Sequence, residues 1–286
     1  MTFSSIETFV SEIGSTLPGG PVAILLMEDY SETNSTIRHH LKAGFSSVLV
    51  LGPTGLEISP ELYSDIHFIT HNFEGTEATA TAINTLMPCL EGRWVYYGYN
   101  AEYLFYPYAE SRSVAEMVRF ATEERRNSIL TYVIDLYADD LSHSPDAVSL
   151  KSAHLDRSGY YALDRHRDGA ALDRQKDMFG GLRWRFEEHV AEPRRKIDRI
   201  GLFKAEKGLQ LRPDHTFNIE EMNTYACPWH NNVTAAICSF RAAKSLCTNP
   251  GSAEQIDSFK WHNSEKFAWH SQQLMNLGLM EPGQWV

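Results

Sequence analysis

The sequence predicts an α/β protein built on a mostly parallel sheet, and three observations support this prediction. Apolar runs of strand length alternate with helical patterns through the first 141 residues. These runs are nearly continuous, as in strands that helices cover on both faces. No linker rich in Pro, Gly and Ser divides the 286 residues. We therefore expect a single domain in which right-handed strand–helix–strand units form the sheet.

The first half of the chain supplies most strands of this sheet. Residues 5–15 carry apolar side chains at helical spacing, and Gly19, Gly20 and Pro21 end that helix. Residues 21–27 are all apolar, which predicts the first buried strand. The predicted elements then follow in this order: a helix at 36–43, strands at 47–51 and 66–70, a helix at 77–90, a strand at 93–99, a helix at 114–124 and a strand at 130–136.

The second half of the chain has a looser pattern. Residues 156–181 are polar and rich in Asp and Arg, and residues 183–212 are locally basic. Apolar spacing predicts a helix over residues 233–246 and at least one more within residues 253–277. The last of these segments contains three aromatic residues that we expect in the core: Trp261, Phe267 and Trp269.

The composition disfavours several classes of protein. A net charge of −11 is the wrong sign for general nucleic-acid binding, which needs a basic surface. No apolar run approaches the roughly 18 residues of a membrane span, and the N-terminus lacks a secretory pattern, so we expect a cytoplasmic protein. There is no Gly-rich phosphate loop and no Gly-x-Ser-x-Gly motif, which disfavours a P-loop kinase or a serine hydrolase. The four cysteines lack CxxC spacing and are expected to be free thiols: Cys89, Cys227, Cys238 and Cys247.

Polar residues follow the tyrosine-rich strand at residues 93–99. Alternate residues of an extended chain point the same way, so Asn100 and Glu102 are expected to face one site. Oxygen ligands of this kind suit Mg²⁺ or Mn²⁺, and such an ion neutralises a diphosphate. The alternative is a strand end with ordinary polar residues, and spacing alone leaves both interpretations open.

Other carboxylates also lie at or just after predicted strand ends. Glu28 and Asp29 follow the first strand, and Asp135 and Asp139 close the strand at 130–136. Ligands of open α/β sheets bind beyond the carboxyl ends of the strands. The sequence therefore places its candidate site at that edge of the sheet.

Several segments resemble the bacterial glycosyltransferase family 2-like proteins of the GT-A type. The similarity is to the branch whose members carry a strand followed by Asp-x-Asp-Glu-Phe-Leu. Here Tyr99-Asn100-Ala101-Glu102-Tyr103-Leu104 takes that place, so Tyr99 and Ala101 replace both Asp residues and only Glu102 is kept. Five further segments carry the resemblance. Residues 23–44 resemble the branch's first strand and helix, and residues 130–141 its Leu-Asp-Met-Tyr strand. Residues 180–186 resemble its Gly-Gly-Pro-Arg segment, residues 203–204 its Lys-x-Pro-Leu step and residues 229–230 its late His-Phe.

The resemblance implies a GT-A-like fold, a mostly parallel sheet flanked by helices with an elaborated C-terminal half. Residues 1–141 would form the nucleotide-binding half, and residues 142–286 the acceptor-side half with the C-terminal helices. The implied activity moves a sugar from a nucleotide-diphosphate donor to a glycan or glycoconjugate acceptor during polysaccharide biosynthesis. It also implies a divalent cation, Mn²⁺ or Mg²⁺, with Glu102 and His230 as its ligands.

The resemblance also implies roles for individual residues. A carboxylate base must take the proton of the acceptor hydroxyl, and Asp135 and Asp139 are the candidates. An alternative role is open for each of the two, and also for Asp29: an ordinary carboxylate in a loop or one that caps a turn. The arginines 183 and 185 suit a phosphate and a sugar face, or else an ion-pair network with the neighbouring Glu187 and Glu188. The candidate donor-binding residues are Asp29, Asn100, Glu102, Arg183 and Arg185.

Two other functions stay open at this point. The loss of both Asp residues of the motif agrees with a catalytically silent GT-A-like protein that serves in binding or assembly. A phosphate-binding hydrolase that uses the same carboxylates is the weaker alternative.

Overall fold

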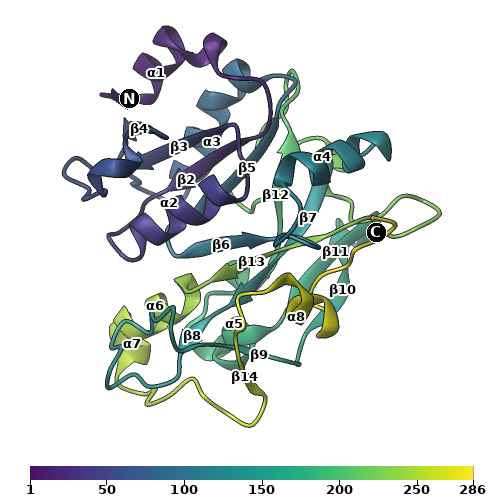
Figure 1. The fold of residues 1–286 in the computed structure, drawn as a ribbon. Coiled ribbons are helices and arrows are strands. Elements are labelled where there is room, and N and C mark those ends of the chain that lie inside the picture. The colour runs from purple at the N-terminus through teal and green to yellow at the C-terminus, as the bar shows by residue number, and fades with distance from the viewer. Residues whose placement is uncertain (286) are drawn as a thin grey trace.

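The computed structural model describes residues 1–285, and its core is one nine-stranded mixed sheet with helices on its faces (Figure 1). The spatial order of the strands departs from their order in the chain. Along the sheet they are β1 (Thr2–Phe3), β4 (His67–Thr70), β3 (Ser47–Gly52), β2 (Val22–Leu26), β5 (Trp94–Tyr99), β12 (Asp198–Lys204), β7 (Ser128–Asp135), β13 (Ala235–Ser239) and β6 (Glu102–Phe105).

Most neighbouring strands of the large sheet are parallel. The run from β1 through β4, β3 and β2 to β5 is parallel throughout, and β13 is parallel to β7. Strand β12 lies antiparallel between β5 and β7, and β6 is antiparallel to β13. Every residue of β2, β3 and β5 is buried, which explains their continuous apolar sequences. The predicted α/β class with a mostly parallel sheet is confirmed.

The order in which the chain adds strands to the sheet reverses between β2 and β5. From β2 the chain adds β3 and β4 on one side, and it then returns to place β5 on the other side. Open α/β sheets bind their ligands at such a switch point, beyond the carboxyl ends of the two central strands. We use the name switch-point crevice for this end of the sheet, defined by the residues that follow β2 and β5. The register brings Leu26 opposite Tyr99 there, so the segments that follow β2 and β5 start side by side.

Helices were predicted correctly in the first half. Helices α1 (Ile6–Glu12), α2 (Thr33–Lys42), α3 (Ala78–Leu86) and α4 (Val114–Glu123) fall within or close to the predicted ranges. A capping box begins α4, in which the Ser113 hydroxyl accepts from the Glu116 backbone and the Glu116 carboxylate accepts from the Ser113 backbone. The helices of the second half are short: α5 (Gly181–Arg185), α6 (Arg241–Thr248), α7 (Pro250–Ala253) and α8 (Ser271–Asn276).

The predicted helix over residues 233–246 is wrong in its first part. Strand β13 occupies Ala235–Ser239, between β7 and β6, and α6 begins only at Arg241. A short, fully apolar run has no period, so periodicity alone does not separate a buried strand from a buried helix. The segment 253–277 holds the last residue of α7, a short strand at Ser264–Lys266 and helix α8. Phe267 and Trp269 pack in or against the core as expected, whereas Trp261 is partly exposed and lies outside the core clusters.

Two small sheets elaborate the second half. Strands β10 (Tyr161–Arg167) and β11 (Ala170–Phe179) form a hairpin. Strand β9 (Ala153–Asp156) lies between β8 (Tyr137–Ala138) and β14 (Ser264–Lys266) near the lower end of Figure 1. Within residues 1–285 no helix has the length and apolar character needed to cross a membrane. All four cysteines carry free thiols, as predicted.

Candidate functional site

The switch-point crevice brings together two residues that the sequence singled out. Asp29 lies in the loop after β2, and Asn100 follows β5 directly. The two side chains are hydrogen-bonded, because the Asn100 amide donates to Asp29 Oδ1. Their meeting follows from the parallel pairing of β2 with β5, which aligns the carboxyl ends of both strands.

Asn100 holds the loop after β2 in place. Its side chain is buried, its Oδ1 accepts from the Glu28 backbone N–H at 3.0 Å, and its Nδ2 also donates to the Ser31 carbonyl at 3.0 Å. A buried amide with these partners, together with Asp29, has used its main hydrogen-bonding capacity inside the protein. Asn100 is therefore a positioning residue, which fixes the loop that carries Glu28 and Asp29.

Asp29 is anchored on one side and open on the other. Its Oδ1 accepts from the Ser31 backbone at 2.8 Å as well as from Asn100, and its Oδ2 accepts from Lys244 Nζ at 2.8 Å. Partial burial favours the neutral acid, but the hydrogen bond and charge of Lys244 outweigh it and lower the pKa of Asp29. The side chain is still 45% exposed, so a ligand can reach it.

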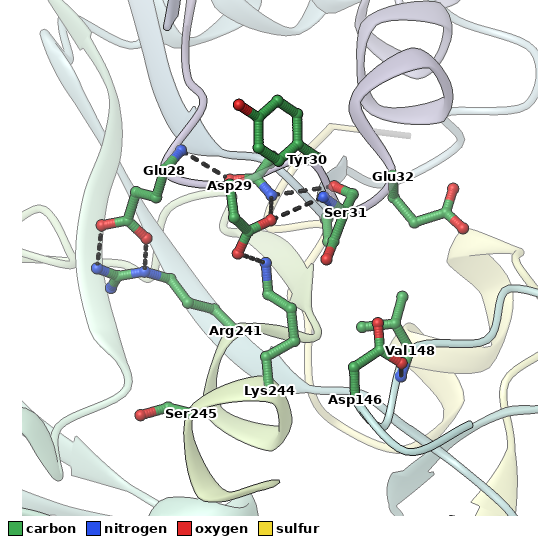
Figure 2. Close-up of polar contacts among 12 residues, drawn as sticks. Glu28, Asp29, Tyr30, Ser31, Glu32, Asp146, Val148, Arg241, Lys244 and Ser245 are labelled. Atoms are coloured by element: carbon green, nitrogen blue, oxygen red, sulfur yellow. Dashed lines mark hydrogen bonds and ion pairs between the residues drawn. The ribbon is translucent and has the colours of Figure 1, made fainter. Parts of the chain in front are cut away.

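Glu28 makes the second ion pair of the crevice, with Arg241. The guanidinium donates twice to the carboxylate, from Nε at 2.6 Å and from Nη2 at 2.7 Å (Figure 2). The Arg241 guanidinium also lies 3.9 Å from the centre of the Tyr99 ring, a cation–π contact. Both partners of this pair are about one-third exposed, at 32% for Glu28 and 35% for Arg241.

Helix α6 supplies both cations of the crevice, and sequence reasoning missed them. Arg241 and Lys244 are three residues apart, so they lie on one face of the helix. Figure 2 shows both reaching from α6 toward the loop after β2. They were overlooked because residues 233–246 were predicted as one helix. A strand-length apolar run before residue 240 was the signal that could have placed Arg241 and Lys244 at a strand end.

Glu102 occupies a different environment from Asn100. It has no exposed surface, and its Oε2 accepts from the Tyr99 backbone at 3.0 Å and from Arg199 Nη1 at 2.7 Å. Its Oε1 accepts from Ser239 Oγ at 3.0 Å and from Arg199 Nη2 at 3.3 Å. Burial opposes ionisation of Glu102, but the charge of Arg199 outweighs burial and lowers the pKa of Glu102 to about 2.

The expectation that Asn100 and Glu102 face one site is not met, because the chain between them is not extended. Ala101 has a φ of 56°, in the left-handed region, and the chain turns there from β5 into β6. Asn100 consequently contacts the loop after β2, whereas Glu102 begins β6 opposite Ser239 of β13 and binds Arg199.

The two candidate metal ligands are not brought together. His230 lies before β13 and its Nε2 is 3.0 Å from Glu124 Oε2, while Glu102 sits beside Ser239 at the far end of β13. Protein donors already occupy both oxygens of Glu102. In the described part of the chain no three His, Cys, Asp or Glu side chains are grouped as metal ligands. These residues therefore do not fit a shared Mg²⁺ or Mn²⁺ ion.

Asp135, at the end of β7, is sealed against Arg183. It accepts from the Arg183 backbone and from Arg183 Nε, each at 3.3 Å, and burial raises the pKa of Asp135 despite that charge. Gly181 packs so closely that a Cβ there would lie 2.9 Å from Asp135 Oδ2. Asp139, by contrast, is exposed, and a hydrogen bond from Ser152 lowers the pKa of Asp139.

The two candidate arginines of α5 belong to a buried ion-pair network. Arg183 pairs with Asp135, and Arg185 donates from Nη1 to Asp156 Oδ1 at 3.1 Å. The indole of Trp261 covers the Arg185 guanidinium at 4.4 Å. The network interpretation is thus the one that the contacts favour, although its acidic members are Asp135 and Asp156 rather than Glu187 and Glu188.

Comparisons with known proteins add no assignment. No protein-family model matches the sequence, and a search of curated proteins finds no significant match. The functional argument therefore depends on the fold and on the crevice.

Proposed function

We propose that this protein is a GT-A-like glycosyltransferase that binds a nucleotide-diphosphate sugar in the switch-point crevice and transfers the sugar to a glycan or glycoconjugate. One observation carries the proposal: two ion pairs stand at the carboxyl ends of β2 and β5. The side chains of Glu28, Asp29 and Arg241 are partly exposed, and that of Lys244 is 10% exposed. The carboxyl ends of the strands are the place where open, mostly parallel sheets bind their ligands. The crevice thus has the position that a nucleotide donor requires.

The chemistry of the crevice suits a diphosphate. In glycosyl transfer from such a donor the diphosphate leaves with its negative charge, which fixed cations stabilise. Arg241 offers a planar fork for two phosphate oxygens, and Lys244 adds a second positive charge. We therefore assign to Arg241 and Lys244 the role that the sequence suggested for Arg183 and Arg185, which are paired elsewhere.

The rest of the donor can be placed by the same reasoning. Asp29 is ionised and partly open, so it can accept hydrogen bonds from sugar hydroxyls. Tyr30, next in the loop, is exposed and offers an aromatic face for the nucleobase of the donor.

Two carboxylates were proposed as the catalytic base that takes the proton of the acceptor hydroxyl. Asp139 is accessible as it stands, whereas Asp135 requires Arg183 to move before an acceptor hydroxyl can reach it.

Calorimetric titration with UDP-, GDP- and dTDP-sugars tests this proposal, with and without Mn²⁺. We expect one class of nucleotide sugar to bind, and the cations of α6 to make Mn²⁺ dispensable for binding. Absence of binding across the whole panel would remove the proposal. A strict requirement for Mn²⁺ would instead show that the charge comes from a metal ion.

A catalytically silent GT-A-like binding or assembly protein is the second candidate. The burial of the altered metal motif favours this candidate. Glu102, Tyr99 and Ala101 are all buried, so none of them is open to a metal ion or a donor. Donor turnover separates the two functions. Slow release of free sugar from the bound donor, abolished in Asp139→Asn or Asp135→Asn, supports an enzyme, whereas tight donor binding without any turnover supports the silent protein.

A further inference from the structure

The two cations of the crevice are already paired with carboxylates, and those carboxylates are held very differently. Asp29 is fixed by Asn100 and by the Ser31 backbone in addition to Lys244. The Glu28 carboxylate has hydrogen bonds only to Arg241 within residues 1–285. Within residues 1–285, Glu28 can therefore leave Arg241 without breaking another side-chain hydrogen bond, and Asp29 cannot leave Lys244 freely because Asn100 and Ser31 hold it.

Arg241 has contacts that do not depend on Glu28. Its guanidinium rests on the Tyr99 ring at 3.9 Å, and its backbone N–H donates to Ser239 Oγ at 3.2 Å. Figure 2 shows Glu28 aligned with the guanidinium through two parallel hydrogen bonds. This fork binds a phosphate in the same way as a carboxylate. Glu28 thus occupies the position in which a phosphate group would be held.

We propose that Glu28 is a built-in competitor for an anion-binding site formed by Arg241 and Lys244, and that the anion is a diphosphate. This inference rests on the proposed function, and it adds how ligand binding at that site is controlled. On arrival one phosphoryl group displaces the Glu28 carboxylate from Arg241, and Asp29 remains anchored. Lys244 stays paired with Asp29 and offers its remaining N–H donors to the second phosphoryl group.

The spacing of the two cations selects a diphosphate over a single phosphate. Arg241 and Lys244 bind different carboxylates, Glu28 and Asp29, so their charged groups stand at two separate positions. A diphosphate has two linked phosphoryl groups and can contact both cations, whereas one inorganic phosphate contacts a single cation well. Pyrophosphate is therefore expected to bind at least about tenfold more tightly than phosphate, because one added charge-assisted hydrogen bond contributes at least that factor to the affinity.

The test is a calorimetric titration of the full chain with inorganic pyrophosphate, with UDP titrated in a separate arm. Glu28→Gln keeps the size of the side chain and removes its charge. We expect Glu28→Gln to bind pyrophosphate about three- to tenfold more tightly than the wild type, because an exposed ion pair offers weak competition. Arg241→Gln and Lys244→Met should each weaken binding at least about tenfold.

A matched control separates competition for Arg241 from a general change in charge. Asp146 is an exposed carboxylate near α6 that accepts from the Val148 backbone, a bond that Asn can also make. Asp146→Asn changes the net charge as Glu28→Gln does and leaves Arg241 paired. It should leave the pyrophosphate affinity within about twofold of the wild type.

Three results would overturn the inference. They are a Glu28→Gln affinity equal to that of the wild type, an equal gain in Asp146→Asn, and no pyrophosphate binding by any variant at millimolar concentration. The proposed function fails separately. If pyrophosphate shows the expected pattern while nucleotide sugars and UDP do not bind, the competitor role stands and the donor assignment falls.

Discussion

Two arginine–glutamate pairs lie at the same edge of the sheet and differ mainly in their access to water. Glu102 and Arg199 are sealed, with 0% and 3% of their side chains exposed. Glu28 and Arg241 are both about one-third exposed. In the sealed pair each charge depends on its partner, whereas in the open pair water or an anion can replace the carboxylate. Solvent access therefore separates the structural pair from the pair that we propose as a ligand site.

The sealed pair also supports the open one. The Glu102 carboxylate accepts from the Tyr99 backbone, and the Arg199 guanidinium lies 5.2 Å from the Tyr99 ring. Tyr99 in turn carries Arg241 on its ring. The rigid interior contact thus positions the side chain that we assign to phosphate binding.

The largest expected effect is the loss of charge at Glu102. Glu102→Gln leaves Arg199 buried without a counter-charge, so the free energy of unfolding should fall by about 3–5 kcal/mol. Urea unfolding followed by tryptophan fluorescence measures it. The double variant Glu102→Gln with Arg199→Met should recover part of the loss, because no unpaired charge is left. A single variant as stable as the wild type would break the comparison between the two pairs.

The same pair predicts how stability depends on pH. The pKa of Glu102 is about 2 in the folded protein, against an ordinary value of 4.5. A lowered pKa stabilises the fold fully above the ordinary value, and this stabilisation is lost as the pH falls toward the folded value. The difference in unfolding free energy between wild type and Glu102→Gln should therefore shrink below about pH 4.5. A difference that stays constant or grows on acidification would contradict the assignment.

A smaller effect is expected at Asn100, which links the buried core to the open loop. Asn100→Ala leaves the Glu28 backbone N–H and the Ser31 carbonyl without this partner, at a cost of about 1–3 kcal/mol. Hydrogen exchange at the Glu28 amide should become faster than in the wild type. Unchanged exchange would mean that Asn100 does not hold the loop.

The smallest effect is expected at the open pair. Glu28→Gln should change the free energy of unfolding by less than about 1 kcal/mol, because water replaces an exposed partner. The same urea titration measures it, beside Glu102→Gln. A loss comparable to that of Glu102→Gln would show that the open pair is structural after all.

The sequence predicted the parts of the fold that depend on local pattern. Strands covered on both faces have continuous apolar sequences, so β2, β3, β5 and β7 were recognised. The same property misled the prediction for β13, because a short apolar run also suits a buried helix. Strand β6 was missed because it begins after a turn at Ala101, whose backbone is left-handed. Alanine is not a residue type that predicts such a turn.

The site was predicted in part for the same reason. Asp29 and Asn100 follow strands that the sequence identified, and parallel pairing brings them together. The partner of Glu102 is Arg199, which lies 97 residues away, and nothing in local sequence links the two. Arg241 and Lys244 were not identified as site residues because the helix was predicted to begin at residue 233, whereas α6 begins at Arg241, directly after a strand. Charge partners of this kind become visible only once the strand order is known.

The most direct test of the central claim is a crystal structure of the protein soaked with UDP. We expect the diphosphate at the carboxyl ends of β2 and β5, with its oxygens within hydrogen-bond distance of Arg241 and Lys244 and with Glu28 turned away. A diphosphate bound elsewhere, with the Glu28–Arg241 pair intact, would contradict the account.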